Sequence, residues 1–261
     1  SKEIRRRIVE TIVHAGKGHI GGALSSVDLL VTLYYGDILR FDPKKPDWEK
    51  RDRFIFSKGH AGIALYVVLS DLGFFSKEEL KNFNQGGSFL AEHPDPSCPG
   101  IEVVSGSLGH GLNICAGMAL AAKLDKKDYA SIAILGDGEC YEGTVWEAAM
   151  FASHHRLNNL IAIIDRNQLA ILDKTENITR LEPFAEKWIS FGWEVKEIDG
   201  HEIKEIEQSL AGFRNRNSNK PLVIIANTIK GKGISFMENQ VKWHHGVPNR
   251  EHLEIALKEL K

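Results

Sequence analysis

The sequence predicts an α/β fold, in which a mostly parallel sheet carries helices on both faces. Short, β-branched apolar runs alternate along the chain with longer segments of helical periodicity, as in repeated strand–helix–strand units. Several of the apolar runs lack period-two alternation, which is typical of strands covered on both faces. No repeat or domain boundary interrupts the pattern, so we expect a single domain over residues 1–261.

The expected elements follow in order along the chain. Strands are predicted at Phe54–Phe56, Ser131–Leu135, Leu160–Ile164, Trp193–Ile198 and Leu222–Ala226. Apolar residues with helical spacing predict helices at Ile4–His14, Val27–Ile38, Ile63–Leu72, Leu112–Leu124, Val145–Leu157, Ile203–Phe213 and Glu251–Leu260. Glycines and prolines predict irregular structure at Gly16–Gly22, Asp42–Trp48, Asn82–Gly111 and Thr228–Pro248. Two of these segments, Asn82–Gly111 and Thr228–Pro248, have the length of functional or disordered loops.

Composition excludes several classes of protein. The net charge of −2 provides no global field toward nucleic acid or an anionic membrane, so neither is expected as a partner. No apolar run approaches the roughly 20 residues of a membrane span, and the charged N-terminal segment does not resemble a signal peptide. The 3 cysteines show no CxxC spacing, which argues against a disulfide framework or structural zinc and fits a cytoplasmic location.

Polar residues follow two neighbouring predicted strands. Asp137, within Gly136-Asp137-Gly138, ends one strand, and Asn167 ends the next. A right-handed crossover brings both strand ends to the same edge of the sheet, where ligands of open α/β sheets bind. A carboxylate and an amide oxygen suit magnesium when a ligand's phosphates complete the octahedron, and the glycines let the backbone approach an anion. The segment Gly136–Asn167 therefore predicts a metal and diphosphate site.

Other interpretations of these glycine motifs are weaker. Gly-Asp-Gly alone would indicate a turn, but the strand–helix–strand context and Asn167 favour a site. Gly16–Gly21 matches the dinucleotide fingerprint G-x-G-x-x-G, yet a helix precedes it where that motif requires a strand. Lys230-Gly231-Lys232-Gly233 suggests a phosphate loop, but the sequence G-x-x-x-x-G-K-[ST] is absent.

The motifs along the chain resemble those of the transketolase family. They are Ala15-Gly16-Lys17-Gly18-His19-Ile20-Gly21-Gly22, Arg51-Asp52-Arg53-Phe54-Ile55-Phe56-Ser57-Lys58-Gly59-His60-Ala61, His93-Pro94, Ser105-Gly106-Ser107-Leu108-Gly109-His110-Gly111, and Gly136-Asp137-Gly138-Glu139-Cys140-Tyr141-Glu142-Gly143 with Asn167. The likeness spans essentially the whole chain. It implies the diphosphate-binding domain fold of that family, with thiamine diphosphate as cofactor and Mg2+ (or Ca2+) as its metal.

The resemblance also implies roles for matching positions. The side chains of Asp137 and Asn167, with the Leu169 carbonyl, would bind the metal, and His60 and the Gly138 backbone would contact the diphosphate. Gly106, Leu108 and Ile171 would line the aminopyrimidine and thiazolium region, although Leu108 and Ile171 could instead be core residues. The full implied cofactor-binding set is His60, Gly106, Leu108, Gly136, Asp137, Gly138, Glu139, Asn167 and Ile171.

Histidines form the implied catalytic set. His19, His60 and His93 would surround the reacting carbons and exchange protons near neutral pH. The last motif contains adjacent histidines: counting from Trp243 selects His244, which we favour, and counting back from Gly246-Val247-Pro248 selects His245. Glu142 would couple the two cofactor sites at a subunit interface, and Glu147 would lie nearby or be only a solvated charge.

The length of the chain leaves room for one α/β domain. In this family a second domain supplies the glutamate that contacts the pyrimidine ring, so we expect the N-terminal half of a split transketolase, inactive alone. Its partner would be a separate pyrimidine-binding, C-terminal subunit, in a heterotetramer of two chains each. Truncation of a longer protein is the alternative, since Ser1 suggests a trimmed start.

The implied reaction is transfer of a two-carbon ketol unit from a ketose phosphate to an aldose phosphate, in the pentose phosphate pathway. A 1-deoxyxylulose-5-phosphate synthase-like enzyme is the runner-up, and the histidine set argues against it. A regulatory pseudo-subunit is a further alternative, which the intact Asp137, Asn167, His19 and His60 disfavour.

Overall fold

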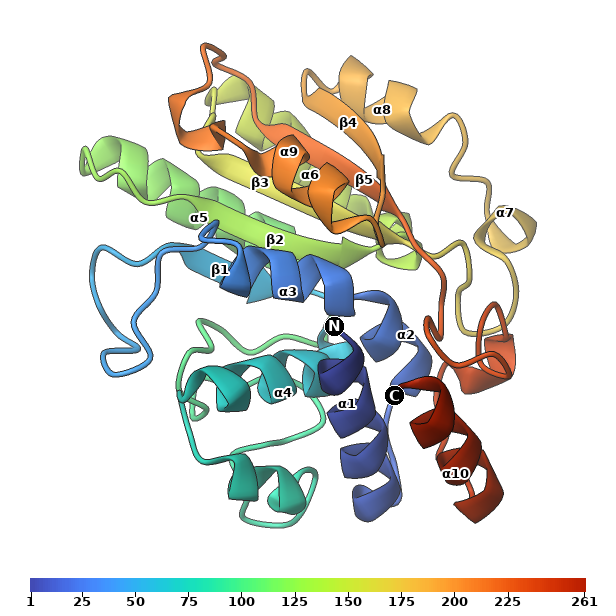
Figure 1. Ribbon diagram of the computed structural model, residues 1–261. Coiled ribbons are helices and arrows are strands. Elements are labelled where there is room, and N and C mark those ends of the chain that lie inside the picture. Colours follow the sequence, from blue (N-terminus) through green and yellow to red (C-terminus); the bar gives the residue numbers. More distant parts are fainter.

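The protein is built around a five-stranded sheet with strand order β1-β2-β3-β5-β4 (Figure 1). The structure is a computed structural model that describes all residues, 1–261. The strands are β1 (Arg53–Phe56), β2 (Ser131–Gly136), β3 (Leu160–Arg166), β4 (Glu194–Asp199) and β5 (Leu222–Asn227). Every neighbouring pair is parallel, which confirms the predicted fold class.

Helices connect the strands and cover both faces of the sheet (Figure 1). The α-helices are α1 (Lys2–Ala15), α2 (Ile20–Ser25), α3 (Val27–Tyr35), α4 (Gly62–Leu72), α5 (His110–Leu124), α6 (Gly143–His154), α7 (Thr175–Ile178), α8 (Phe184–Ser190), α9 (Ile203–Leu210) and α10 (Arg250–Glu259). Short 3-10 turns are η1 (Gly59–Ala61), η2 (Lys77–Asn82), η3 (Gly138–Tyr141), η4 (Phe213–Asn215) and η5 (Val241–Trp243). None of the helices has the length and apolar character needed to cross a membrane.

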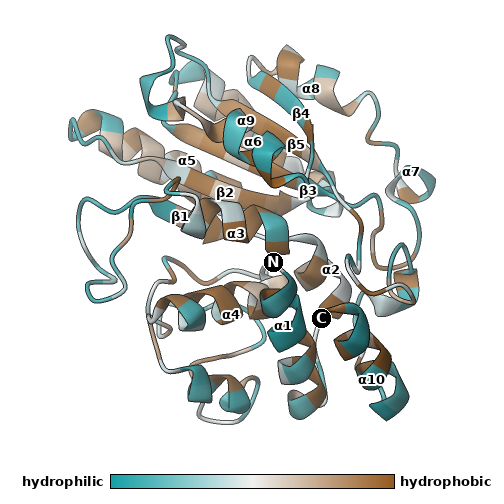
Figure 2. Cartoon of the chain, viewed as in Figure 1, coloured by the Kyte–Doolittle hydropathy of each residue, from teal (hydrophilic) through white to brown (hydrophobic).

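Alternate residues of each central strand enter different halves of the core. Ile132 and Ile134 pack with α1, α3 and α4, whereas Ala133 and Leu135 pack with α5, α6 and α8. Both side-chain directions are therefore buried, which explains the continuous apolar runs of the central strands. Figure 2 shows these strands as predominantly hydrophobic, with hydrophilic residues on the outer faces of α1, α9 and α10.

The expected elements differ from the structure mainly at their ends. The predicted helix Val27–Ile38 ends as α3 at Tyr35, because the following Gly36 caps it and Asp37 adopts a left-handed φ of 55°. The predicted helix that reached Phe213 ends at Leu210, ahead of Gly212 with φ 65°. Sequence periodicity also missed α7, α8 and α2, the last of which begins within the stretch Gly16–Gly22 that was expected to be irregular.

The parallel register collects the site residues at one edge of the sheet. Gly136 pairs with Asp165, and Arg166 pairs with Asn227, so β2, β3 and β5 end nearly level. The chain continues from these ends into the segments that carry Asp137, Asn167 and Lys230. The predicted meeting of Asp137 and Asn167 at the carboxyl edge is thus a direct consequence of the sheet topology.

Candidate active site at the carboxyl edge of the sheet

A cavity of about 370 Å³ opens at this edge, a volume within the range of small-molecule sites. Segments that follow β1, β2, β3 and β5 form its walls. Most of the predicted site residues line it: His60, Leu108, Gly136, Asp137, Gly138, Glu139, Glu142, Asn167, Leu169, Ile171 and His244. The remaining predicted residues, His19, His93, Gly106 and His245, lie outside the lining.

Asp137 is a buried carboxylate held by the backbone around it. The amide of Gln168 donates to its Oδ2 at 2.6 Å, and the amide of Gly138 donates to its Oδ1 at 2.8 Å. Burial, with the nearby charge of Asp165, raises the pKa of Asp137 to about 6. A positive charge beside this carboxylate, such as that of a divalent cation, would favour its ionised form.

Oxygen atoms of the turn after β3 lie beside Asp137. Asn167 is buried, and its Oδ1 accepts from the Leu169 amide at 3.1 Å, which fixes the amide side chain within the turn. Gln168 adopts a left-handed φ of 60° between them. The side-chain oxygens of Asp137 and Asn167 and the carbonyl of Leu169 form a hard-oxygen donor set suited to Mg2+ or Ca2+.

Glu139 lines the cavity but is occupied within the protein. Ser57 Oγ donates to its carboxylate, as do the amides of Gly109 at 3.0 Å and Gly136 at 3.1 Å. The amide of Gly136 is therefore already bonded, as is that of Gly138, whereas the sequence suggested that both amides were free for an anion. Glu139 instead ties the turn after β2 to the loops that precede α4 and α5.

Lys58 and Asp165 form a buried ion pair at the cavity, and Lys58 is one of the residues that line it. The carboxylate of Asp165 accepts from Lys58 Nζ and from the hydroxyls of Ser25 and Ser26, each at 2.7 Å, and from Thr228. Burial alone would raise the pKa of Asp165, but Lys58 and these hydroxyls hold it below its usual value. The pair joins α2 to the ends of β1, β3 and β5.

Lys230 places a second buried ammonium group at the cavity. Its Nζ donates to the carbonyl oxygens of Leu169 at 2.6 Å and Ala170 at 3.2 Å, and lies 3.0 Å from Nδ1 of His244. None of these partners is a carboxylate. Burial and the nearby Lys58 lower the pKa of Lys230 to about 8, so the site has a positive charge that an anionic ligand would stabilise.

Four histidines gather next to the two lysines. The ring centroids of His19 lie 5.2 Å from His60, 5.4 Å from His244 and 4.6 Å from His245, and His60 stacks on His244 at 5.2 Å. Burial and Lys58 lower the pKa of His60 well below its usual value. Burial and Lys230 lower the pKa of His244 to about 3, so both rings are neutral at pH 7 and able to accept a proton.

Backbone hydrogen bonds join the two histidine-bearing segments from opposite ends of the chain. The Gly246 amide donates to the Gly18 carbonyl at 3.1 Å, and the Gly231 amide donates to the Gly21 carbonyl at 3.0 Å. A Cβ at Gly21 would lie 2.6 Å from the carbonyl oxygen of Trp243, so only glycine permits this approach. The backbone therefore holds His19 and His244 at their separation.

His93 lies near His19 and against Gly106. A Cβ on Gly106 would approach His93 Cδ2 to 2.5 Å, and Gly106 has a φ of 132° that side-chain-bearing residues rarely adopt. Gly106 is thus required by the position of the His93 ring. His93 itself is exposed, as is His245.

The rim of the cavity is apolar and open. Ile171 is 59% exposed and Leu108 is half-buried, so neither is the core residue that the alternative interpretation of the sequence offered, and Leu172 is 80% exposed. Ile178, which also lines the cavity, is exposed too. Glu142 and Glu147 are both exposed, Glu142 at the rim and Glu147 on α6.

Sequence analysis missed four residues of this site: Lys58, Glu92, Asp165 and Lys230. Lys58 and Asp165 come just after predicted strands, and Lys230 follows the last strand. The rule that ligands bind at the carboxyl ends of strands could have selected all three. Glu92 lies in a long loop and had no such signal.

Comparison with known proteins identifies the family to which the chain belongs. Residues 1–259 match the family model described as transketolase, thiamine diphosphate binding domain. The chain belongs to the transketolase family. The crystal structure of transketolase from Campylobacter jejuni superposes with a TM-score of 0.93 at 34% identity, covering 98% of this chain and 41% of that one. The chain thus spans about two fifths of that solved transketolase, and its fold is that of the family's cofactor-binding domain.

Curated relatives include proteins of similar length to this chain. One of the subunits of apulose-4-phosphate transketolase from Phocaeicola vulgatus is 47% identical over 260 residues, which cover 100% of this chain and 92% of the relative. A 6-deoxy-6-sulfo-D-fructose transketolase subunit from Clostridium sp. is 42% identical and is covered to 94%. Human transketolase is 35% identical, and the match covers 38% of it. The expected assignment of the chain to the transketolase family of transferases, as a subunit of the split form, is confirmed.

Proposed function

We propose that this chain binds thiamine diphosphate through Mg2+ (or Ca2+) and is the diphosphate-binding subunit of a two-chain transketolase. The observation that carries the proposal is the meeting of Asp137, Asn167 and the Leu169 carbonyl with the buried cation of Lys230. A metal ion and an anion are the ligands that oxygen donors and an ammonium group together would hold. The whole chain, residues 1–261, would serve as one cofactor-binding domain.

The residues present fit this cofactor. The oxygens of Asp137, Asn167 and Leu169 lie at the ends of β2 and β3, and the cavity beside them has room for a small molecule. Lys230 offers positive charge to a diphosphate, and His60, His244 and Gly138 line the same cavity. Gly106, Leu108 and Ile171 would border the rings, while Gly136 and Glu139 would shape the turn rather than donate to phosphate.

When bound, thiamine diphosphate supplies a nucleophilic carbanion that accepts the ketol unit. The residues of this chain would manage the protons of the sugar. His19, His60 and His93, with His244, are the proposed proton-transfer groups, and His60 and His244 are neutral at pH 7. His244 lines the cavity and contacts Lys230, while His245 lies farther out beside His19, which favours His244 as the histidine nearest the cofactor.

The proposed reaction transfers a two-carbon ketol unit between ketose and aldose phosphates. The names of the relatives, which refer to apulose 4-phosphate and to 6-deoxy-6-sulfo-D-fructose, support a sugar carrying an anionic group as substrate. Carbohydrate metabolism in the cytoplasm would be the setting, and the 3 free, buried cysteines fit a reducing compartment.

A separate pyrimidine-binding subunit would complete the site. Exposed Ile171, Leu172 and Ile178 form an apolar rim next to the cavity, which a partner chain would cover. The relatives are named as subunits of larger transketolases, which supports such a partner. We propose a heterotetramer of two chains each, with Glu142 and Glu147 near the interface between cofactor sites.

Thermal unfolding of the chain with Mg2+ and thiamine diphosphate tests the proposal. At about 100 times the dissociation constant, binding adds about 2.7 kcal/mol to the free energy of unfolding, or on the order of 5–10 °C in Tm. Asp137→Asn should abolish the shift. Asp173→Asn, the same change at an exposed carboxylate of the next loop, should preserve it.

The partner chain extends this test to catalysis. Mixing it with the wild-type chain, metal and cofactor should produce ketol transfer that neither chain shows alone. Absence of a thermal shift in the wild type, even with the partner present, would refute the cofactor assignment. Full activity of this chain without a partner would refute the half-site assignment.

A further inference from the structure

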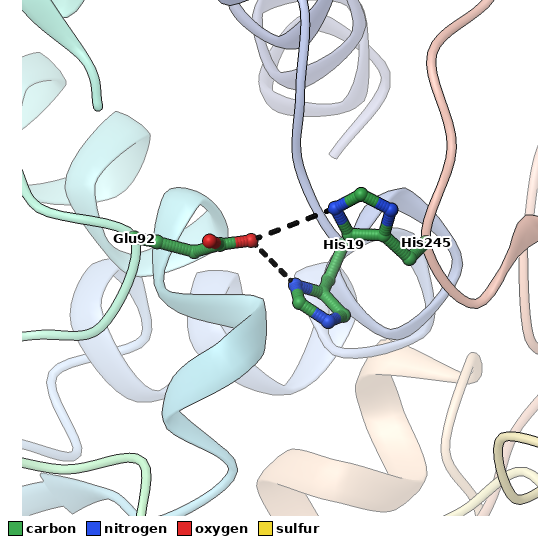
Figure 3. Close-up of side chains that lie close together, drawn as sticks. All are labelled: His19, Glu92 and His245. Carbon is green, nitrogen blue, oxygen red and sulfur yellow. Dashed lines mark ion pairs between the residues drawn. The ribbon is translucent and has the colours of Figure 1, made fainter. Parts of the chain in front are cut away.

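Glu92 meets two histidines where three distant segments converge (Figure 3). Its Oε1 lies 2.8 Å from Nδ1 of His19 and 3.8 Å from Nε2 of His245. Glu92 comes from the loop before α5, His19 immediately precedes α2, and His245 follows η5. Glu92 supplies the carboxylate that forms ion pairs with His19 and His245.

The contact between Glu92 and His19 is short. Glu92 Oε1 and His19 Nδ1 are both buried atoms that make no well-aligned hydrogen bond, and their polar contacts are this ion pair and, for Oε1, the longer one to His245. Two ligands of a tetrahedral zinc ion, each about 2.0 Å from the metal, would lie about 3.3 Å apart. The separation of 2.8 Å is instead that of a direct ion-pair contact, in which an unprotonated Nδ1 would set its lone pair against the carboxylate oxygen.

We propose that Glu92 is a positioning residue that holds Nδ1–H of His19 and so presents the Nε2 of that ring for proton transfer. This inference rests on the proposed function, in which His19 handles protons of the sugar. A carboxylate on one ring nitrogen fixes the tautomer and the orientation of an imidazole, leaving the other nitrogen to react. No other side chain is within reach to do this for His19.

The carboxylate of Glu92 also counteracts the groups that lower the pKa of His19. His60 of η1, His93 beside Glu92, and His244 and His245 beyond η5 all face this ring. Burial lowers the pKa of His19, and Glu92 acts in the opposite direction. Without Glu92, the pKa of His19 would fall further, because only groups that disfavour a positive charge would remain near it.

Because Oε1 is shared, His19 and His245 depend on one negative charge. A single carboxylate oxygen cannot fully stabilise a positive charge on both rings, so Glu92 favours the charged imidazolium form of only one of them. The shorter distance assigns that form to His19.

Ring 15N NMR of the full-length chain with labelled histidines tests this directly. In the wild type, His19 should show a protonated Nδ1 in its neutral form. Glu92→Gln should lower the pKa of His19 by about one unit, and Glu92→Ala should also release the Nδ1–H tautomer. Glu92→Asp should restore part of the effect, and His19→Asn identifies the resonances.

Asp95→Asn is the matched control, since it removes the same charge from the same loop at a half-buried residue that accepts a hydrogen bond from the amide of Ser97. It should leave the His19 resonances unchanged. Unchanged ring shifts of His19 in Glu92→Ala would overturn the proposal. Zinc that co-purifies with the wild type and is lost in Glu92→Gln would also overturn it, because the three residues would then be metal ligands.

In the complex with its partner, Glu92→Gln should lower kcat more than it raises KM. The limb of the pH profile that reports His19 should move toward lower pH, since the variant ring loses its proton more readily. An unaltered pH profile with a reduced rate would overturn the positioning role. These NMR results do not depend on ketol transfer, so failure of the proposed function would be distinguishable from failure of this inference.

Discussion

The ammonium nitrogen of Lys230 lies 2.6 Å from the main-chain carbonyl oxygen of Leu169. This carbonyl is also a proposed ligand of the metal, and a carbonyl oxygen has two lone pairs with which to serve both. A buried cation and a metal ion would then approach one anionic ligand from adjacent positions. The geometry explains why a lysine without a carboxylate partner is retained at the cavity.

Lys230→Met should weaken binding of thiamine diphosphate. Loss of one hydrogen bond to a charged group costs about 1.5–3 kcal/mol, which is roughly a 10- to 100-fold rise in Kd. Isothermal titration with Mg2+ present measures the change. Lys232→Met, two residues away and outside the cavity lining, should bind as the wild type does. Equal affinities of the two variants would contradict the role of Lys230.

Asp165→Asn should strongly destabilise the fold, because it leaves Lys58 buried without a counter-charge. Removing one member of a buried pair costs about 3–5 kcal/mol, on the order of 10 °C in Tm. Lys58→Met together with Asp165→Asn should cost less than the sum of the single changes. Urea unfolding measures this coupling, and strict additivity would contradict it. Asp128→Asn, at an exposed ion pair with Arg40, should change the free energy of unfolding far less.

Gly106→Ala should displace His93 and strain the loop before α5. The new methyl group would meet the His93 ring at a φ of 132°, with a cost of about 1–3 kcal/mol. Gly117→Ala on α5, where nothing lies within 4 Å of the added Cβ, should instead stabilise by about 0.4–1 kcal/mol. Differential scanning calorimetry of both variants checks the opposite signs, and equal shifts would contradict the prediction.

The stability contributed by Asp28 should depend on pH. Asp28 accepts from Arg5 at 3.1 Å and from His201 at 2.7 Å. Burial would raise its pKa, but these two partners hold it well below the ordinary value. A depressed folded-state pKa gives stability that is fully present above the unfolded pKa of about 3.9 and is lost as pH falls below it.

Asp28→Asn should therefore cost about 3 kcal/mol at pH 7 and progressively less as the pH falls below about 4. Urea unfolding at several pH values measures the gap between variant and wild type. Glu78→Gln, at an exposed pair with Lys81, is the control and should show a small difference at pH 7. A gap that stayed constant down to pH 3 would refute the assignment to Asp28.

Much of the fold was predictable because the central strands are buried on both faces. Ile132 and Ala133 are both inside, so the apolar run was visible without alternation. The helix α2 was missed since Gly21 and Gly22 lower helix propensity, and Gly21 is required there by the close approach of Trp243. Tertiary contacts decided that segment, and no local pattern carries them.

The site residues likewise divide into those that the sequence could predict and those that depend on tertiary packing. Asp137 and Asn167 follow neighbouring strands, and parallel topology made their meeting predictable. His19, Glu92 and His245 lie in separate irregular loops, and their approach depends on how those loops pack. The resemblance supplied the histidines but gave no signal for Glu92, whose partners became visible only in three dimensions.

The hydrogen bonds from Gly246 to Gly18 and from Gly231 to Gly21 have a consequence for biosynthesis. A ribosome-bound chain that has just completed β5 has every strand of the sheet, yet it still lacks Lys230 and both late histidines. Such a chain could begin to fold but could not hold the cofactor in the way proposed. Cofactor capture would thus follow completion of the sheet and would mark a polypeptide whose translation had passed residue 246.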